Sequence, residues 1–257
     1  MKTMTIIGRA FIAIAMIVFG VQHFVYLEFV TRAFPVIPLW IPGHIIFVCI
    51  LGAFLIITGV AVLLQIKART LSVFLGSTIL LTFLLLLLPS LLTNLNNGMV
   101  WTNAGKALVL AGANFLVAAS FAKDSNNNVI NVLEKLIPLG KYFLAGFFIL
   151  AGILHFIYAP FVAMLIPKWI PAPLFWTYFA GVALIVGAIG MLIPRTQFLA
   201  ATLSAIMVFI LVIILHIPRA LADLHQPNET TATFEALAMC GMAILIAVFA
   251  KQAKRIS

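Results

Sequence analysis

A chain of 257 residues is long enough for one or two soluble domains, but 65% of its residues are hydrophobic and only 8% are charged. Soluble globular domains are about half apolar and about a quarter charged, so this composition indicates an integral membrane protein. The net charge of +9 does not indicate nucleic-acid binding, because the basic residues are spread over loop ends and form no Lys/Arg-rich stripe.

Apolar runs alternate with short polar clusters along the chain, and each run has about the 20 residues that a helix needs to cross a membrane. Continuous apolar stretches such as LTFLLLLLPSLL (81–92) lack the alternating pattern of a membrane β-barrel. We therefore predict an all-α membrane protein with eight transmembrane helices. They are expected near residues 5–27, 44–64, 71–92, 105–122, 141–159, 173–193, 198–217 and 233–250.

Two segments far apart in the chain share one motif. HFVYLEFV (23–30) resembles HFIYAPFV (155–162), and PLWIPG (38–43) resembles PKWIPA (167–172). Beyond this loop the offset between matching residues settles at 129, as in Gly52 and Gly181. We predict an internal duplication, with one four-helix repeat in residues 1–122 and a second in residues 141–257.

The segment 123–140 is polar and is expected to be a cytoplasmic linker with a short surface helix at 129–136. Because each repeat has an even number of crossings, the repeats run parallel and form two four-helix bundles about a pseudo-twofold axis. A cytoplasmic N-terminus places most of the 15 Lys and Arg residues inside. The positive-inside rule thus predicts that both termini are cytoplasmic.

All five histidines and all four tryptophans fall on the outer side in this topology, so any chemistry is expected there. The candidate catalytic residues are His23 and His155. Their neighbours predicted to shape a cofactor pocket are Tyr26, Tyr158, Trp40 and Trp169. A histidine at this depth can donate a hydrogen bond to a quinone carbonyl while a tryptophan stacks on the ring.

Three other readings of these residues stay open. Each histidine can instead tie the Pro-x-Trp-Ile-Pro loop to the helix end, and the tryptophans can belong to an interfacial aromatic belt. Axial ligation of haem is a weaker alternative, because one histidine per helix has no further ligand spacing, and no other metal site is predicted. Lys106 and Glu235 occupy equivalent positions at the outer starts of the fourth and eighth runs, where they either form a salt bridge across the pseudo-twofold axis or each reach the lipid head groups.

The combination of His-Phe at the first helix end, Pro-x-Trp-Ile-Pro, and a glycine-rich second helix (GVALIVGAIGMLI) resembles the DoxX-like family of bacterial membrane proteins. The resemblance implies four-helix bundles and membrane redox chemistry. Family members often carry a glutamate after the glycine of the second helix, where this chain has Phe54 and Ala183. A proton role that depends on that carboxylate does not transfer.

We therefore expect a multi-pass protein of a bacterial inner membrane that handles quinone or another lipid-soluble redox molecule at the outer leaflet. The chain has no flavin, iron–sulfur or dithiol motif, so a quinone-dependent oxidoreductase would need a soluble redox partner on the outer side. Membrane lipids are its other expected partners. The alternatives are a non-enzymatic scaffold subunit and a transporter of small molecules or lipids.

Overall fold

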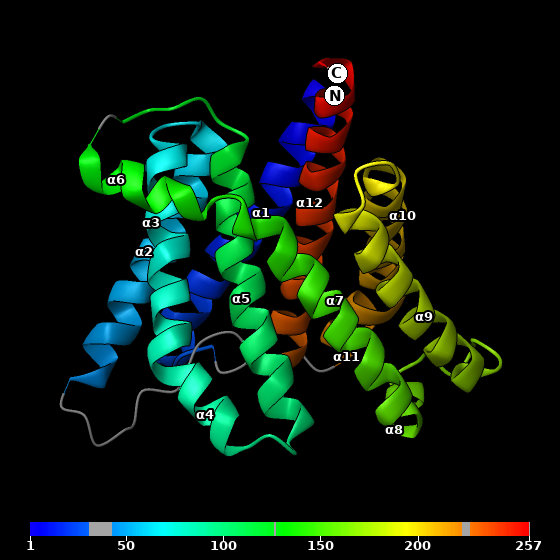
Figure 1. Cartoon of the computed structure of the whole chain (residues 1–257). Helices are drawn as coiled ribbons and strands as arrows, with labels where there is room; N and C mark the ends of the chain where they lie inside the picture. The colour runs from blue at the N-terminus through cyan, green and yellow to red at the C-terminus, as the bar shows by residue number, and fades with distance from the viewer. Residues whose placement is uncertain (31–42, 126, 223–226, 257) are drawn as a thin grey trace.

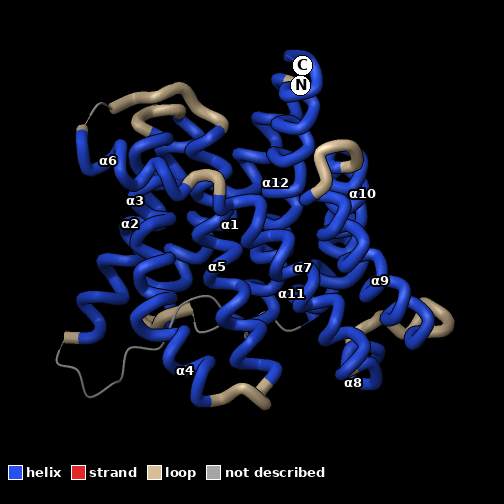
Figure 2. Tube along the Cα trace, viewed as in Figure 1, coloured by secondary structure: helices blue, strands red, loops and turns tan. Residues whose placement is uncertain are grey.

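The computed structural model of the chain describes residues 1–30, 43–125, 127–222 and 227–256. All regular structure within these residues is helical, as Figure 2 shows, which confirms the predicted all-α class. Seven of the described helices are long and apolar enough to cross a membrane. The chain is therefore a multi-pass helical membrane protein.

The first half of the chain contributes four long helical segments, the third of which is interrupted by a π-helix. These are α1 (Lys2–Tyr26), α2 (His44–Leu64), α3 (Ala68–Thr82) with π-helix η1 (Phe83–Leu87) and α4 (Leu88–Thr93), and α5 (Gly98–Ala119).

The second half follows the same order after a short linker. The linker holds α6 (Asn128–Leu133) and the 3-10 helix η2 (Glu134–Leu136). The long segments are α7 (Leu139–Ile157) with the short α8 (Ala159–Met164), α9 (Pro173–Leu192), α10 (Gln197–Leu211) with π-helix η3 (Val212–His216) and α11 (Ile217–Ala222), and α12 (Pro227–Ile256). The predicted surface helix at 129–136 is confirmed.

Helix α5 corresponds to the predicted fourth crossing but is not among the seven apolar candidates. It has 22 residues, which is enough to span a membrane, but it carries Lys106 and Asn114. It packs against α3, α7 and α12, and almost every residue from Ala107 to Ala118 is buried. A helix enclosed by protein needs no continuous lipid-facing apolar surface, which explains its lower hydropathy.

Helix α12 is the other central helix. Buried residues make up 72% of its most apolar stretch, against 28–39% in the six other candidates. It contacts α1, α10 and α5, and Figure 1 shows α5 and α12 in the middle of the molecule. The remaining long helices surround this pair and expose large aliphatic side chains, as lipid-facing helices do.

Both π-helices precede a proline by two residues, at Pro89 and Pro218. A proline has no backbone N–H and its ring pushes against the carbonyl group four residues earlier. The preceding turn is widened into a π-helix in each case, which is one of the ordinary responses of a helix to proline.

Glycines bring the first two helices of each half close together. A methyl group on Gly20 would lie 2.6 Å from the Gly52 carbonyl oxygen, and one on Gly152 would lie 2.7 Å from the Gly181 carbonyl oxygen. Such contacts let helix backbones approach closely, as in the small-residue interfaces of membrane helices. The contacts α1–α2 and α7–α9 are among the most extensive in the molecule.

A second set of glycine crossings joins the two halves. Gly8 of α1 meets Gly241 of α12, and Gly112 of α5 meets Gly140 of α7; each added methyl would lie within 3.0 Å of the facing carbonyl oxygen. Helices α1 and α5 of the first half touch each other only slightly. In neither half does the first long helix pack extensively against the last one, which differs from the predicted pair of four-helix bundles.

The two ends of the molecule differ in what they carry. Both chain termini and the linker helix α6 lie together at one end, which we call the terminal end (Figure 1). The opposite end, with Tyr26, His44, Gly98 and Ile157, is called the distal end. The predicted segregation of chain termini and linker from the histidine-bearing helix ends is therefore present in the fold.

Candidate functional site

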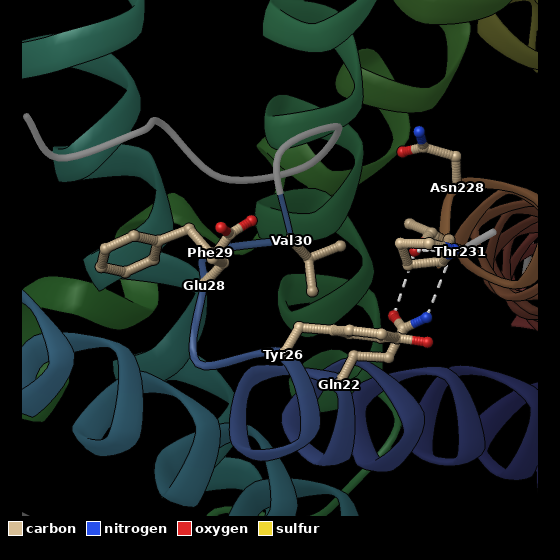
Figure 3. A pocket seen from close by; sticks show the side chains of 8 residues that line it. Gln22, Tyr26, Glu28, Phe29, Val30, Asn228 and Thr231 are labelled. Carbon is tan, nitrogen blue, oxygen red and sulfur yellow. Dashed lines mark hydrogen bonds between the residues drawn. The ribbon is translucent and has the colours of Figure 1, made fainter. Parts of the chain in front are cut away.

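A polar pocket lies at the distal end between the end of α1 and the start of α12. Its cavity has a volume of about 190 Å³. The pocket is lined by Gln22, Tyr26, Glu28, Phe29, Val30, Pro227, Asn228 and Thr231. Figure 3 shows the side chains of Gln22 and Thr231 pointing toward each other from the two helices.

Hydrogen bonds join the two walls of the pocket. The Thr231 hydroxyl lies 3.1 Å from Gln22 Oε1 and 2.8 Å from the Pro227 carbonyl oxygen. Gln22 Nε2 donates to the same carbonyl group over 3.4 Å. Gln22 and Thr231 are both buried, and their polar atoms stabilise the contact between α1 and α12 because buried polar groups need partners.

The local backbone explains how the chain forms this pocket. Helix α1 stops at Leu27, which has a left-handed conformation with φ of 52°. That residue turns the chain back, so that Glu28, Phe29 and Val30 line the pocket, although Figure 3 shows the Phe29 ring directed away from Gln22 and Thr231. Proline is well suited to the first position of a helix because its missing N–H needs no partner there, and Pro227 begins α12.

A buried ion pair lies one helical turn below the pocket. Glu235 follows Thr231 by four residues on α12, and its Oε2 lies 2.6 Å from Lys106 Nζ on α5. The side chains are only 13% and 4% exposed for Lys106 and Glu235 respectively. Of the two alternatives that the sequence left open for these residues, the structure shows the salt bridge.

Its depth differs from the prediction, which placed both residues at the starts of their helices. Helix α5 begins at Gly98, where the Asn97 side chain accepts hydrogen bonds from two backbone N–H groups of the first turn, and α12 begins at Pro227. Each charged residue is therefore eight residues inside its helix, about 12 Å from the helix start. The Asn97 cap explains why α5 begins before its apolar run, and Pro227, which suits the first position of a helix, does the same for α12.

His23, predicted as a catalytic residue, lies beside the pocket and not in its lining. Its ring is fully buried, and Nδ1 lies 2.6 Å from the Phe19 carbonyl oxygen one turn earlier. Because a carbonyl oxygen only accepts, Nδ1 carries the proton. The ring also meets Phe29 edge-on at 5.9 Å between centroids, so His23 supports a residue of the pocket wall.

His155 has the same local geometry in the second half. Its Nδ1 lies 2.7 Å from the Ala151 carbonyl oxygen, and its Cβ lies 3.1 Å from the position of a methyl on Gly181. His23 makes the same approach to Gly52, at 2.9 Å. In both halves the histidine packs where the first helix crosses the second.

The predicted aromatic neighbours are divided between different places. Tyr26 lines the pocket, whereas Tyr158 packs over Gly98 at the start of α5, with its hydroxyl 2.8 Å from the position of an added methyl. Trp169 is 72% exposed in the turn that joins Pro167 to Ile170. Trp40 lies outside the described residues.

The pocket has a less polar counterpart position between the end of α7 and the start of α5. Gln22 corresponds to Leu154, and Thr231 corresponds to Thr102, whose hydroxyl donates to the Gly98 carbonyl oxygen over 2.8 Å. Sequence reasoning missed Gln22 and Thr231 because it followed residues shared by both halves. The available signal was a difference between the halves, because Gln22 is an amide side chain in a run where the second half has Leu154.

Comparisons with known proteins give one result. A protein family described as a domain of unknown function (DUF8561) matches residues 144–253 of the chain. The matched range contains α8 to α11 with η3, most of α7 and nearly all of α12. Neither the curated proteins nor the solved structures contain a match to this chain.

Proposed function

We propose that this protein binds the head group of a quinone, or of another lipid-soluble redox molecule, at the outer leaflet of a bacterial inner membrane. In this proposal it is a duplicated DoxX-like protein and the membrane subunit of a quinone-dependent oxidoreductase. The observation that carries the proposal is the pocket between α1 and α12, with buried Gln22 and Thr231 beside Tyr26.

The chemistry of the pocket suits a ring with carbonyl or hydroxyl groups. The Gln22 amide can donate and accept, and the hydroxyls of Tyr26 and Thr231 can do both as well. A quinone carbonyl accepts a hydrogen bond, whereas the corresponding quinol donates one, so such side chains suit both redox states. Phe29 and Val30 provide apolar surface for the ring.

The duplicated architecture is supported by paired features in the two halves. The glycine crossings, the histidine hydrogen bonds and the π-helices each occur twice, at positions 132 or 129 residues apart. The family match at residues 144–253 also falls within the second half alone. We therefore count α5 as a membrane crossing, which brings the total to eight, and treat it as the equivalent of α12.

Cytoplasmic termini are supported by the charge distribution and the shared location of termini and linker. Most Lys and Arg residues belong to the terminal end, as the positive-inside rule expects of a cytoplasmic face. The pocket then opens at the outer leaflet, where a soluble electron-transfer partner can reach it. Reporter fusions after residue 257 and in the loop between α9 and α10 test this, because both should give only cytoplasmic signals.

The test of the function is quinone binding to the purified protein in detergent. We expect calorimetric titration with a short-chain benzoquinone to give one binding site per chain. Gln22→Leu, which introduces the residue found at the equivalent position of the second half, should weaken binding about tenfold, the effect of roughly one hydrogen bond.

A matched pair of variants separates the pocket from general effects on helix packing. Thr231→Val removes the hydroxyl that bonds Gln22, whereas Thr102→Val removes the equivalent hydroxyl near the start of α5. Weaker binding only in Thr231→Val supports the proposal. Equal affinity in Gln22→Leu, Thr231→Val and the unmodified protein would refute it.

A scaffold role is the alternative that a specific observation favours. Both histidines form hydrogen bonds to carbonyl groups of their own helices and pack on the glycine crossings. If the protein is a scaffold, His23→Ala and His155→Ala lower the melting temperature, and no quinone binds to either variant or to the unmodified chain.

A further inference from the structure

A second cavity lies at the terminal end, between the start of α1 and the ends of α2 and α12. Its volume is about 340 Å³. The residues that line it are Met1, Lys2, Thr5, Ile6, Arg9, Gln65 and Gln252. Two of these side chains are cations, three carry neutral hydrogen-bonding groups, and the lining contains no carboxylate side chain.

The Arg9 guanidinium in this cavity is held in place by its neighbours. Its Nε donates to Ser120 Oγ over 2.7 Å, and Nη2 donates to the Ser120 carbonyl oxygen. Its Cζ lies 3.5 Å from the centroid of the Phe121 ring, a cation–π contact. These contacts fix one edge and one face of the guanidinium, so the charge is oriented before any ligand binds.

The charge of Arg9 is not balanced by the ion pairs of the described residues. Those pairs join Arg69 to Glu134, Lys106 to Glu235 and Arg219 to Glu229. A half-buried cation held by neutral groups attracts an anion, and guanidinium favours phosphate because its planar donors match the oxygen geometry. Lys2 lies one to two helical turns away on α1 and lines the same cavity.

We propose that this cavity binds the phosphate group of an anionic phospholipid. Basic pockets between helices at the cytoplasmic surface are suited to such head groups because the inner leaflet is negatively charged. Arg9 and Lys2 bind the phosphate oxygens, while Gln65 and Gln252 donate hydrogen bonds from α2 and α12. The acyl chains follow the lipid-facing surface of α1 and α2. The site is distinct from the distal pocket and does not depend on quinone binding.

The second half lacks this arrangement, which argues that the site is specific to one place. Arg9 corresponds to Lys141, whose Nζ lies 4.9 Å from the Tyr142 ring, and Ser120 corresponds to Phe249. Many basic residues lie at the terminal end, but Arg9 is held in place by specific contacts with Ser120 and the Phe121 ring. These contacts distinguish the proposed site from a general attraction of anions to this end.

Native mass spectrometry of the full chain in detergent tests the proposal. The probes are phosphatidylglycerol and phosphatidylcholine with identical acyl chains, and inorganic phosphate as a competitor. We expect phosphatidylglycerol to form a one-to-one adduct in preference to phosphatidylcholine. Gln65→Glu places a carboxylate in the cavity without removing an Arg9 contact and should weaken the phosphatidylglycerol adduct about fivefold.

Lys2→Gln should weaken the adduct by a similar factor, because it removes an exposed charge from the same cavity. Lys251→Gln is the matched control, since Lys251 also lies near the terminal end, on α12, but its Nζ packs over the Phe198 ring. Unchanged adducts in both Gln65→Glu and Lys2→Gln, with melting temperatures preserved, would overturn the proposal. An equal loss in Lys251→Gln would also do so, because it would indicate unspecific attraction.

Inorganic phosphate distinguishes the lipid from a free anion. If the acyl chains contribute, millimolar phosphate leaves the phosphatidylglycerol adduct in place. If phosphate displaces the lipid completely at that concentration, the cavity binds free phosphate and the lipid assignment is wrong. The same variants tested for quinone titration should show unaltered affinity, which separates this site from the distal pocket.

Discussion

At the residue scale, the Lys106–Glu235 pair is the most consequential polar contact in the centre of the molecule. Both charges are buried at a contact between α5 and α12, where removal from water costs several kcal/mol per ion. The pair is therefore stable only while both partners are present. Glu235 lies one turn below Thr231 on α12, and neither member of the ion pair lines the distal pocket.

Neutralising one partner should strongly destabilise the protein. We expect Glu235→Gln to lower the free energy of unfolding by about 3 kcal/mol, because it leaves a buried ammonium group without its carboxylate. The exchanged variant, Lys106→Glu with Glu235→Lys, should recover much of this loss. Thermal unfolding in detergent measures both effects.

A more exposed ion pair provides the control for this prediction. Arg219 and Glu229 are 28% and 18% exposed at the distal end, so Glu229→Gln should cost less than about 1 kcal/mol. If Glu235→Gln and Glu229→Gln change the melting temperature equally, burial of the Lys106–Glu235 pair does not control its energy.

Sequence reasoning at this scale identified pairs of equivalent residues and missed unique ones. It identified the Lys106–Glu235 contact as one of two alternatives, because the residues are equivalent and would pair if their helices met. It could not identify the hydrogen bond between Gln22 and Thr231, since that contact depends on how α1 of one half packs against α12 of the other. Long-range packing of this kind is not encoded in the spacing of residues along one helix.

At the element scale, the helix boundaries were largely predictable because membrane thickness sets the length of each apolar run. The runs predicted at 44–64 and 173–193 agree with α2 and α9 to within one residue. The starts of α5 and α12 were predicted about six residues too late. Asn97 and Pro227 favour helix initiation at those points, although the following turns contain polar residues.

The close helix crossings depend on the absence of side chains at glycine. We expect Gly20→Ala to cost about 1–3 kcal/mol, because the added methyl would lie 2.6 Å from the Gly52 carbonyl oxygen and force α1 away from α2. Gly146→Ala in α7 is the control, since nothing lies within 4 Å of its added methyl. Alanine favours helix there, so the melting temperature should stay constant or rise.

This comparison uses one substitution at two helical glycines and therefore separates crowding from helix propensity. A loss of stability in Gly146→Ala, or no loss of stability in Gly20→Ala, would contradict the role assigned to the α1–α2 crossing.

The start of α3 depends on a side chain from the linker. Asp124 accepts hydrogen bonds from the backbone N–H groups of Arg69 and Thr70, and from the Thr70 hydroxyl, whereas the α3 N-cap residue Lys67 provides no side-chain cap. We expect Asp124→Ala to destabilise this end of α3 by about 1 kcal/mol. Faster amide hydrogen exchange at Thr70 and Leu71, with unchanged exchange in the middle of α12, would be the signature.

Asp124→Asn serves as a milder variant, because its remaining carbonyl oxygen can still accept one of these bonds. If Asp124→Ala leaves exchange at Thr70 unchanged, the linker does not cap α3.

At the scale of the whole molecule, each half packs its first and last long helices against the other half. Helix α1 packs chiefly on α2 and α12, and α5 packs chiefly on α3 and α7. The sequence indicated the duplication but not these contacts between the halves. The offset between repeats is the same whether the first helix of a half packs on the last helix of its own half or of the other half. The deciding residues are the glycines at the crossings between halves, where Gly8 faces Gly241 and Gly112 faces Gly140.

This arrangement predicts the behaviour of a chain divided in the linker. Residues 1–126 and 127–257, coexpressed as separate polypeptides, should assemble and copurify through a tag on either one, because the contacts α1–α12 and α5–α7 join them without the covalent link. Gly241→Leu should abolish copurification, since a methyl at this position already lies 2.6 Å from the Gly8 carbonyl oxygen. Gly190→Leu, at a contact between α9 and the start of α10 within one half, should preserve it. Separate halves that each melt like the intact protein would show that the halves are independent bundles, as the repeat pattern alone suggested.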